Sequence, residues 1–156
     1  MEVVTDDGRP AEPGQMGRVV LTPLFNRAMP LVRYEMGDYA VLAARRDCPR
    51  SPLGLARIVG RERELFKLPD GRKIMPRLPI HVAHRLALRK FKLIQTTLTD
   101  IEMLYVLQDD GVEISRNMAQ DIVDRFMSPG FRVHPRRVSE IPRARGGKYL
   151  MHECLV

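Results

Sequence analysis

The sequence contains no tryptophan, and its aromatic residues are five phenylalanines and four tyrosines among 156 residues. Its two cysteines, Cys48 and Cys154, stand at no metal-ligand spacing and make no disulfide framework, which favours a reducing compartment. No run approaches the ~18 apolar residues of a membrane span, and the N-terminus has neither the basic nor the apolar region of a secretory signal. We therefore expect a cytoplasmic protein and no membrane partner.

Acidic residues are outnumbered: 26 Lys and Arg stand against 19 Asp and Glu, which gives a formal net charge of +7. Residues 1–55 carry seven charges of each sign, so the whole excess lies in residues 56–156. A basic surface suits phosphate-bearing partners, namely a nucleotide, a coenzyme, a nucleic acid or an acidic membrane. The charge alone does not choose among them.

The first third of the chain reads as strands and turns. Residues 2–5 and 17–22 predict a hairpin with a long connection, and residues 34–43 predict two short segments broken at Gly37. Residues 45–54 are polar with two prolines and are unsuited to regular structure. A domain boundary is expected between about residues 55 and 63.

The pattern then becomes α+β, in the order ββαββαβ. Turn residues Pro69, Asp70 and Gly71 predict a hairpin, and helical spacing of apolar residues predicts helices over 79–90 and 115–127. The second helix has Ser115 as its expected N-cap, and its expected buried stripe consists of Met118, Ile122, Val123 and Phe126. Strands are expected over 91–97, 101–107, 131–138 and 149–156.

Three short segments have the composition of binding sites. Asp38 follows a glycine at the end of a strand, where its two acceptor oxygens suit the paired hydroxyls of a ribose, although Gly-Asp also forms ordinary turns. Arg61 follows Gly60, where a guanidinium can pair with phosphate oxygens, although the charges of residues 58–64 also suit a solvated linker. Lys148 ends a glycine-containing basic loop. Its ammonium, on a long flexible stem, can stay in contact with a phosphate as the phosphate reacts, although such a lysine can also simply be solvated.

The order and spacing of these segments resemble the C-terminal part of adenylate-forming enzymes, the acyl-CoA synthetase superfamily, and most closely its phenylacetate-CoA ligase-like branch. The resemblance covers essentially the whole chain. It implies that residues 1–59 are the β-rich C-terminal remnant of the large adenylate-binding domain and that residues 60–64 are a hinge. Residues 65–156 would then be the small mobile C-terminal domain.

The same resemblance implies a role for each site residue. Asp38 and Arg61 would bind the nucleotide, and Lys148 would be the catalytic lysine that bridges the acid and the α-phosphate. Arg63 falls at the hinge position, where the family usually has Asp or Lys. Gly71 is the candidate for a coenzyme A loop, although its surroundings depart from the family's Arg-Gly pattern.

The function implied is activation of a carboxylic acid, with aryl acids among the candidates, by ATP to an acyl adenylate, followed by transfer to coenzyme A. The chain lacks the phosphate loop, the acid pocket and any ligands for the Mg²⁺ that accompanies ATP, so we expect it to be inactive alone. Its implied partners are the large N-terminal domain, which is missing from this sequence, and a small carboxylic acid.

Two other interpretations fit the composition. A small basic α+β module could bind nucleic acid, but no strand carries the cluster of basic and aromatic residues typical of RNA-binding sheets. A remnant domain could instead mediate protein contacts through exposed strand edges.

Overall fold

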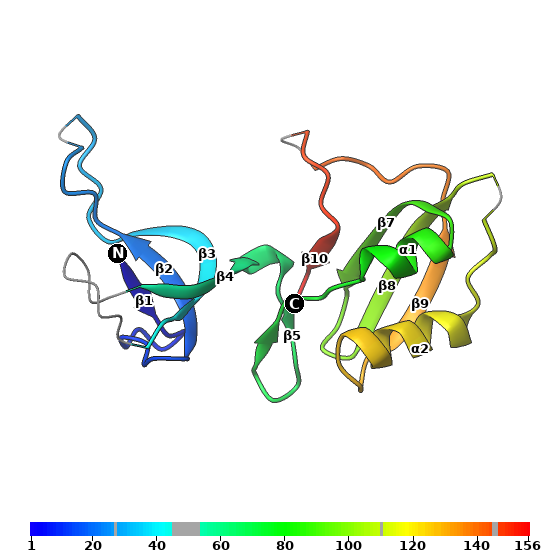
Figure 1. Ribbon diagram of the computed structural model, residues 1–156, viewed down its shortest axis with the longest axis horizontal. Helices are drawn as coiled ribbons and strands as arrows, with labels where there is room; N and C mark the ends of the chain where they lie inside the picture. Colours follow the sequence, from blue (N-terminus) through cyan, green and yellow to red (C-terminus); the bar gives the residue numbers. More distant parts are fainter. Residues whose placement is uncertain (27, 45–53, 110, 145–146) are drawn as a thin grey trace. The chain divides into compact units, whose positions relative to one another are not determined.

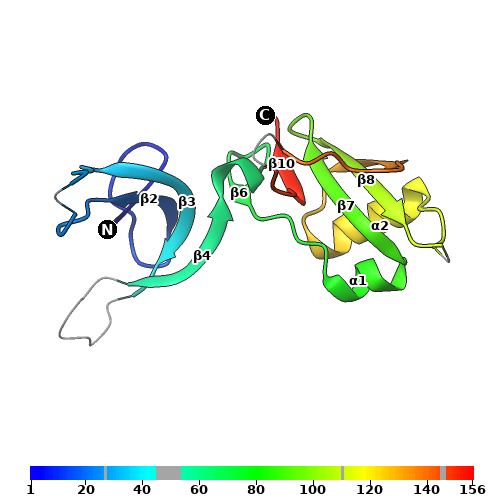
Figure 2. The same cartoon turned by 90° about the horizontal axis from the view of Figure 1, so that it is seen from above.

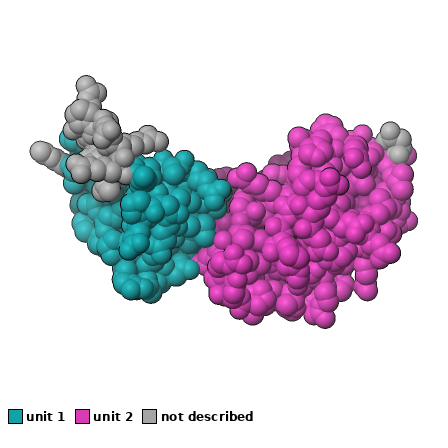
Figure 3. All heavy atoms as spheres, turned by 60° about the horizontal axis from the view of Figure 1, so that its bottom comes forward, with its two compact units in different colours: residues 1–62 teal, residues 63–156 magenta. Residues whose placement is uncertain are grey.

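The computed structural model describes the whole chain except residues 27, 45–53, 110 and 145–146. Cys48 and nearly all of the segment 45–54 therefore lie outside the described residues. The chain divides into two compact units, residues 1–62 and residues 63–156, which are coloured separately in Figure 3. Each unit is described by itself.

The first unit is an antiparallel sheet in the order β1-β2-β3-β4. The bounds are Glu2–Val4 for β1, Met16–Leu21 for β2, Tyr34–Leu42 for β3 and Leu55–Arg61 for β4. The expected hairpin of the first two strands is confirmed, with Val3 opposite Val19. Gly17 is required there because a Cβ atom would lie 2.5 Å from the carbonyl oxygen of Val4.

The expected break at Gly37 was wrong, because β3 continues through it (Figure 1). Gly37 has a φ of +74°, a conformation that glycine adopts without steric cost. β3 therefore accommodates the irregular backbone at this position and pairs with β2 before and after it, with a shift of register between.

The fourth strand occupies residues that the sequence presented as a charged linker. β4 pairs along β3 with Asp38 opposite Arg61 and Tyr39 opposite Gly60. A short 3₁₀ helix, η1, follows at Glu62–Glu64, across the division between the two units. The segment 60–64 thus contains the end of a strand and one helical turn.

The second unit is α+β, as the sequence predicted. Its main sheet has the order β10-β7-β8-β9, in which β7 and β8 are antiparallel and the two outer strands run parallel to their neighbours. The elements are β5 Phe66–Lys67, β6 Lys73–Ile74, α1 Ile80–Arg85, β7 Leu88–Gln95, β8 Asp100–Leu107, α2 Arg116–Phe126, β9 Arg132–Arg137 and β10 His152–Cys154. Their order is ββαββαββ, one strand longer than the expected order ββαββαβ, and the two strands after α2 lie within the expected ranges 131–138 and 149–156.

The first helix is shorter than expected and the second is as expected. α1 stops at Arg85, Ala87 adopts a φ of +47°, and Leu88 already belongs to β7, so the predicted helix over 79–90 was too long. α2 begins after Ser115, whose hydroxyl accepts a hydrogen bond from the Met118 N–H at 3.3 Å. Its buried residues are Ala119 and Val123, so the expected buried stripe is confirmed only at Val123, and Met118, Ile122 and Phe126 are half-buried.

Both helices cover one face of the sheet, as Figures 1 and 2 show. One core joins residues of α1 and α2 to the facing strand residues, among them Ala83, Val123, Leu93 and Met103. The opposite face carries a smaller cluster around Ile141. Among the described residues, no helix is both long and apolar enough to cross a membrane.

Candidate functional site

Arg61 is the last residue of β4 and lies opposite Asp38, which is in the middle of β3 and not at a strand end as expected. The Arg61 Nε is 3.7 Å from the Asp38 Oδ1, and the Asp38 side chain is 27% exposed. Asp38 Oδ2 has no hydrogen-bond partner within the described part of the chain. The pair therefore presents one unengaged carboxylate oxygen beside a guanidinium, a combination that can accept a hydroxyl and approach a phosphate.

The neighbouring Tyr39 holds this part of the sheet in place. Its ring is buried, with 1% exposure, and its hydroxyl lies 2.5 Å from Asp6 Oδ1 and 3.2 Å from Glu62 Oε1. A phenol has a single proton, so it donates to one of these carboxylates at a time. This contact ties the residue that follows β4 to the first turn of the chain.

Lys148 lies in the loop before β10, in the second unit. The Ala144 N–H donates to the Lys148 carbonyl at 3.0 Å, the Gly147 N–H donates to the Ala144 carbonyl at 2.8 Å, and Gly147 has a φ of +73°. The Lys148 side chain is exposed, and its ammonium has no partner among the described residues. The backbone is thus closed into a turn that presents a charge to solvent.

Residues on both sides anchor this loop. Ile141, 1% exposed, packs with Leu104 and Val106 on the face of the sheet away from the helices. The Tyr149 hydroxyl accepts from the Phe91 N–H at 3.0 Å and donates to the Phe91 carbonyl. Burial raises the pKa of Tyr149 above its usual value. No local pattern of residues indicates this anchor.

The two other expected site residues lie at exposed turns of the second unit. Arg63 is exposed in η1. Gly71 lies at the tip of the β5–β6 turn, where it has a φ of +85° and open space where a Cβ would be. The Asp70 carboxylate closes this turn by accepting from the Arg72 N–H at 2.9 Å, which lowers the pKa of Asp70.

A buried glutamine positions the β5–β6 hairpin. Gln95 is fully buried in β7, and its side-chain amide accepts from the Lys67 N–H and donates to the Lys67 carbonyl, both at 2.7 Å. The amide thereby takes the place of a neighbouring strand. A polar residue at an inward position of an alternating strand was the available signal, and the sequence prediction missed it.

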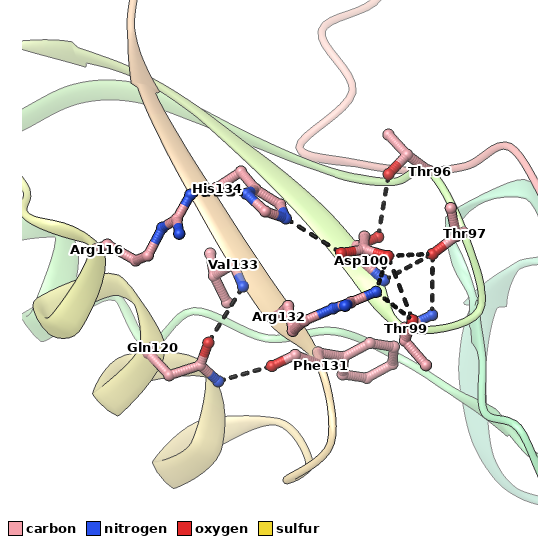
Figure 4. A network of polar contacts seen from close by, with 10 residues as sticks. All are labelled: Thr96, Thr97, Thr99, Asp100, Arg116, Gln120, Phe131, Arg132, Val133 and His134. Carbon is pink, nitrogen blue, oxygen red and sulfur yellow. Dashed lines mark hydrogen bonds and ion pairs between the residues drawn. The ribbon is translucent and has the colours of Figure 1, made fainter.

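A polar network stabilises the start of β8 and β9 (Figure 4). Asp100 accepts from Thr97 at 2.6 Å and Arg132 at 2.8 Å through Oδ2, and from His134 at 3.1 Å through Oδ1. The Thr97 hydroxyl, His134 and Arg132 hold the pKa of Asp100 well below its usual value. Because both of its oxygens already accept hydrogen bonds, we assign this carboxylate a structural role.

No group of three or more His, Cys, Asp or Glu residues among the described residues could hold a metal ion.

Comparison with known proteins finds similar folds among solved structures. No family model and no curated protein sequence matches the chain. Among solved structures, o-succinylbenzoate CoA synthetase from Bacillus subtilis, in complex with its acyl-adenylate intermediate, is similar with a TM-score of 0.63 and 16% identity; the match covers 97% of this chain and 32% of that one. A 2-hydroxyisobutyryl-CoA ligase in the postadenylation state is similar with a TM-score of 0.63 and 20% identity, and the match covers 96% of this chain and 34% of that one.

An amide bond synthetase from Marinactinospora thermotolerans is similar with a TM-score of 0.58 and 14% identity, over 94% of this chain and 32% of that one. The chain thus spans about a third of the length of these proteins. Its fold is that of the corresponding third of adenylate-forming CoA ligases.

Proposed function

We propose that this chain is the C-terminal portion of an AMP-forming carboxylic acid ligase of the phenylacetate-CoA ligase-like branch. Residues 1–59 complete the large adenylate-binding domain, residues 60–64 form the hinge, and residues 65–156 form the small mobile domain. The observation that carries the proposal is the likeness of fold, over 97% of the chain, to a ligase in complex with its acyl adenylate.

The reaction joins an acid to AMP and then releases it to a thiol. The carboxylate attacks the α-phosphorus of ATP, a P–O bond forms, and pyrophosphate leaves with the bonding electrons. Negative charge accumulates on the α-phosphate oxygens as this happens. A cation delivered to those oxygens stabilises that charge, and the exposed Lys148 ammonium on its anchored loop suits this role.

Asp38 is the proposed acceptor for the ribose hydroxyls. Its Oδ2 is unengaged within the described part of the chain, and Oδ1 is only 3.7 Å from Arg61. An ionised carboxylate can accept a hydrogen bond on each oxygen, which matches two vicinal hydroxyls. Arg61 then stands where it can contact the ribose or a phosphate oxygen.

The first unit carries the surface expected of a domain fragment. Leu24, Phe25, Met29 and Val32 are between 60% and 96% exposed, and Ile58 is 68% exposed. Exposed apolar groups of this size mark protein contacts. The proposed partner that covers them is the remainder of the large domain.

Coenzyme A is the proposed acyl acceptor, with Gly71 as the candidate contact in the small domain. Its thiol would attack the acyl carbon, and AMP would leave with the electrons of the acyl–phosphate bond. Because one similar structure is an amide bond synthetase, an amine acceptor is the competing assignment. Supplying a purified acyl adenylate with either coenzyme A or an amine distinguishes them by the product formed.

The test compares the isolated chain with the chain joined to the large domain of its own ligase, here called the restored ligase. Exchange of labelled pyrophosphate into ATP is measured with a panel of aryl and alkyl acids. The restored ligase should exchange with at least one acid, and the isolated chain with none. Ordinary turnover by the isolated chain, or none by the restored ligase, would overturn the proposal.

A further inference from the structure

A groove of about 490 Å³ lies between α1 and α2 in the second unit, apart from every residue assigned above. We propose that it binds a small amphipathic monocarboxylate, with the apolar body on the groove floor and the carboxylate between Arg85 and Arg125. Because the groove and its ligand contacts belong to the second unit alone, the inference is independent of the ligase proposal.

The floor of the groove is a stripe of apolar side chains that the sequence presented as core. Met118, Ile122 and Phe126 follow one another at four-residue spacing on α2, and all three stay half-buried. Val82 of α1 and Leu86, the residue that follows this helix, line the other side at the same spacing. Residues four apart share a helix face, so the two helices turn apolar faces toward one groove.

Aromatic contacts shape the groove without a ligand. The Phe126 ring makes an edge contact with His81 of α1, with ring centroids 6.1 Å apart. The Arg125 guanidinium carbon lies 5.5 Å from the centroid of the same ring. Phe126 therefore joins the two helices and fixes one cationic group beside the apolar floor.

The charge of the groove matches a monoanion. Arg85 and Arg125 come from different helices, and neither has an ion-pair partner among the described residues. Asp121 is the one acidic residue among those lining the groove. With His81 counted as neutral, the residues lining the groove carry a net charge of +1. One carboxylate neutralises this charge, whereas a dianionic phosphate would leave an excess negative charge.

Size favours a small molecule over a protein segment. Small-ligand sites have volumes of roughly 300–1,000 Å³ and mostly apolar linings with a few polar groups. α1 has six residues, a length of about 9 Å at the rise of an α-helix. One wall is thus too short to seat several turns of a partner helix.

The experiment titrates octanoate into the isolated chain and follows backbone amide shifts by NMR. The expected result is saturable binding, with the shifts concentrated in α1 and α2. Octanol, which has the same apolar body without the charge, should bind at least about tenfold more weakly, the loss expected for a charge-assisted hydrogen bond. This comparison uses only the unchanged protein, so its result can be interpreted even if a variant fails to fold.

The double variant Arg85→Gln and Arg125→Gln should lower the affinity for octanoate at least about tenfold and leave the affinity for octanol unchanged. Arg77→Gln, an exposed arginine of the same unit outside the groove, should change neither. No saturable octanoate binding, or shifts elsewhere, would overturn the proposal. Tighter binding of octyl phosphate than of octanoate would overturn the choice of a monocarboxylate.

Discussion

The hydroxyl of Tyr149 satisfies both backbone groups of Phe91, accepting from its N–H at 3.0 Å and donating to its carbonyl. Two residues further along, the Leu93 N–H donates to the Met151 carbonyl at 2.8 Å, and β10 continues the parallel pairing from His152. The phenol therefore extends the edge of the β7–β10 ladder by one position. It fixes the residue directly after Lys148.

Tyr149→Phe should lower the free energy of unfolding of the second unit by about 1–3 kcal/mol, the cost of leaving buried backbone groups without partners. Urea denaturation followed by circular dichroism measures this loss. Tyr34→Phe is the control, because Tyr34 is 51% exposed in the other unit and its hydroxyl has no partner among the described residues. Equal stability of the two variants would show that water replaces the Tyr149 contacts.

Lys148→Ala in the restored ligase should lower the rate of adenylation about 10²–10³-fold, the typical effect of removing a group that stabilises transition-state charge. Thioester formation from a supplied acyl adenylate should be largely spared, since that step needs no new charge at the α-phosphate. The two half-reactions are measured separately, with Lys90→Ala as a control on β7. An equal fall in both rates would assign Lys148 a structural role.

Asp38→Asn in the restored ligase should weaken ATP binding by about 1.5–3 kcal/mol, because the amide has one acceptor oxygen and no charge. The apparent affinity for the acid should change less. The ion pair with Arg61 is partly exposed, so its loss should change the unfolding free energy by less than about 1 kcal/mol. Glu35→Gln, which breaks an arginine ion pair on the same strand, is the matched control and should leave ATP binding unchanged.

His152 should make the second unit less stable in mild acid. Burial lowers its pKa from 6.5 to about 4, and its Nε2 has no partner among the described residues. The folded state therefore favours neutral histidine, whose stabilising effect is fully present above pH 6.5 and is lost as the pH falls toward 4. The loss should be about 1.4 kcal/mol per pH unit.

Urea denaturation measures this slope, and His152→Leu should flatten it by removing the titrating group. The lowered pKa of Asp100 adds a slope of the same sign only below about pH 5, where the unfolded carboxyl begins to bind protons, so the two proteins are compared between pH 7 and pH 5. A slope unchanged in the variant would mean that another group titrates in this range.

The sequence predicted those elements whose local residue pattern also matches their surroundings in the folded protein. β7 and β8 are apolar runs that pair with each other, and α2 carries its own N-cap in Ser115. The extent of α1 could not be predicted, because Leu88 fits the helical spacing as well as it fits the strand that tertiary pairing selects. Gly37 likewise signals a turn in isolation, but β3 pairs with β2 at Glu35 before it and at Tyr39 after it, across a shift of register.

The same distinction applies to the candidate site. Asp38 and Arg61 were each singled out by the glycine before them, but their pairing depends on the register of two strands. The anchors Tyr149 and Gln95 act through backbone groups of Phe91 and Lys67. Such contacts join residues far apart in the chain and leave no local pattern.

Arg63→Pro tests the proposed hinge. Arg63 lies within η1, and residues of a 3₁₀ helix have φ values of about −50 to −70°, close to the φ of about −65° that proline imposes. Proline at this position should therefore be compatible with the observed backbone conformation and should disfavour any other conformation. A hinge must visit two sets of dihedral angles, so fixing one set should stop one half-reaction.

In the restored ligase we expect Arg63→Pro to form and accumulate the acyl adenylate while transfer to coenzyme A nearly stops. The melting temperature should change little, because Arg63 is exposed. Arg63→Ala removes the same side chain without restricting the backbone and should keep both steps, which separates a conformational effect from the loss of charge. Normal rates for both steps in the proline variant would place the pivot elsewhere, and early melting with loss of both would show that this turn is packed structure.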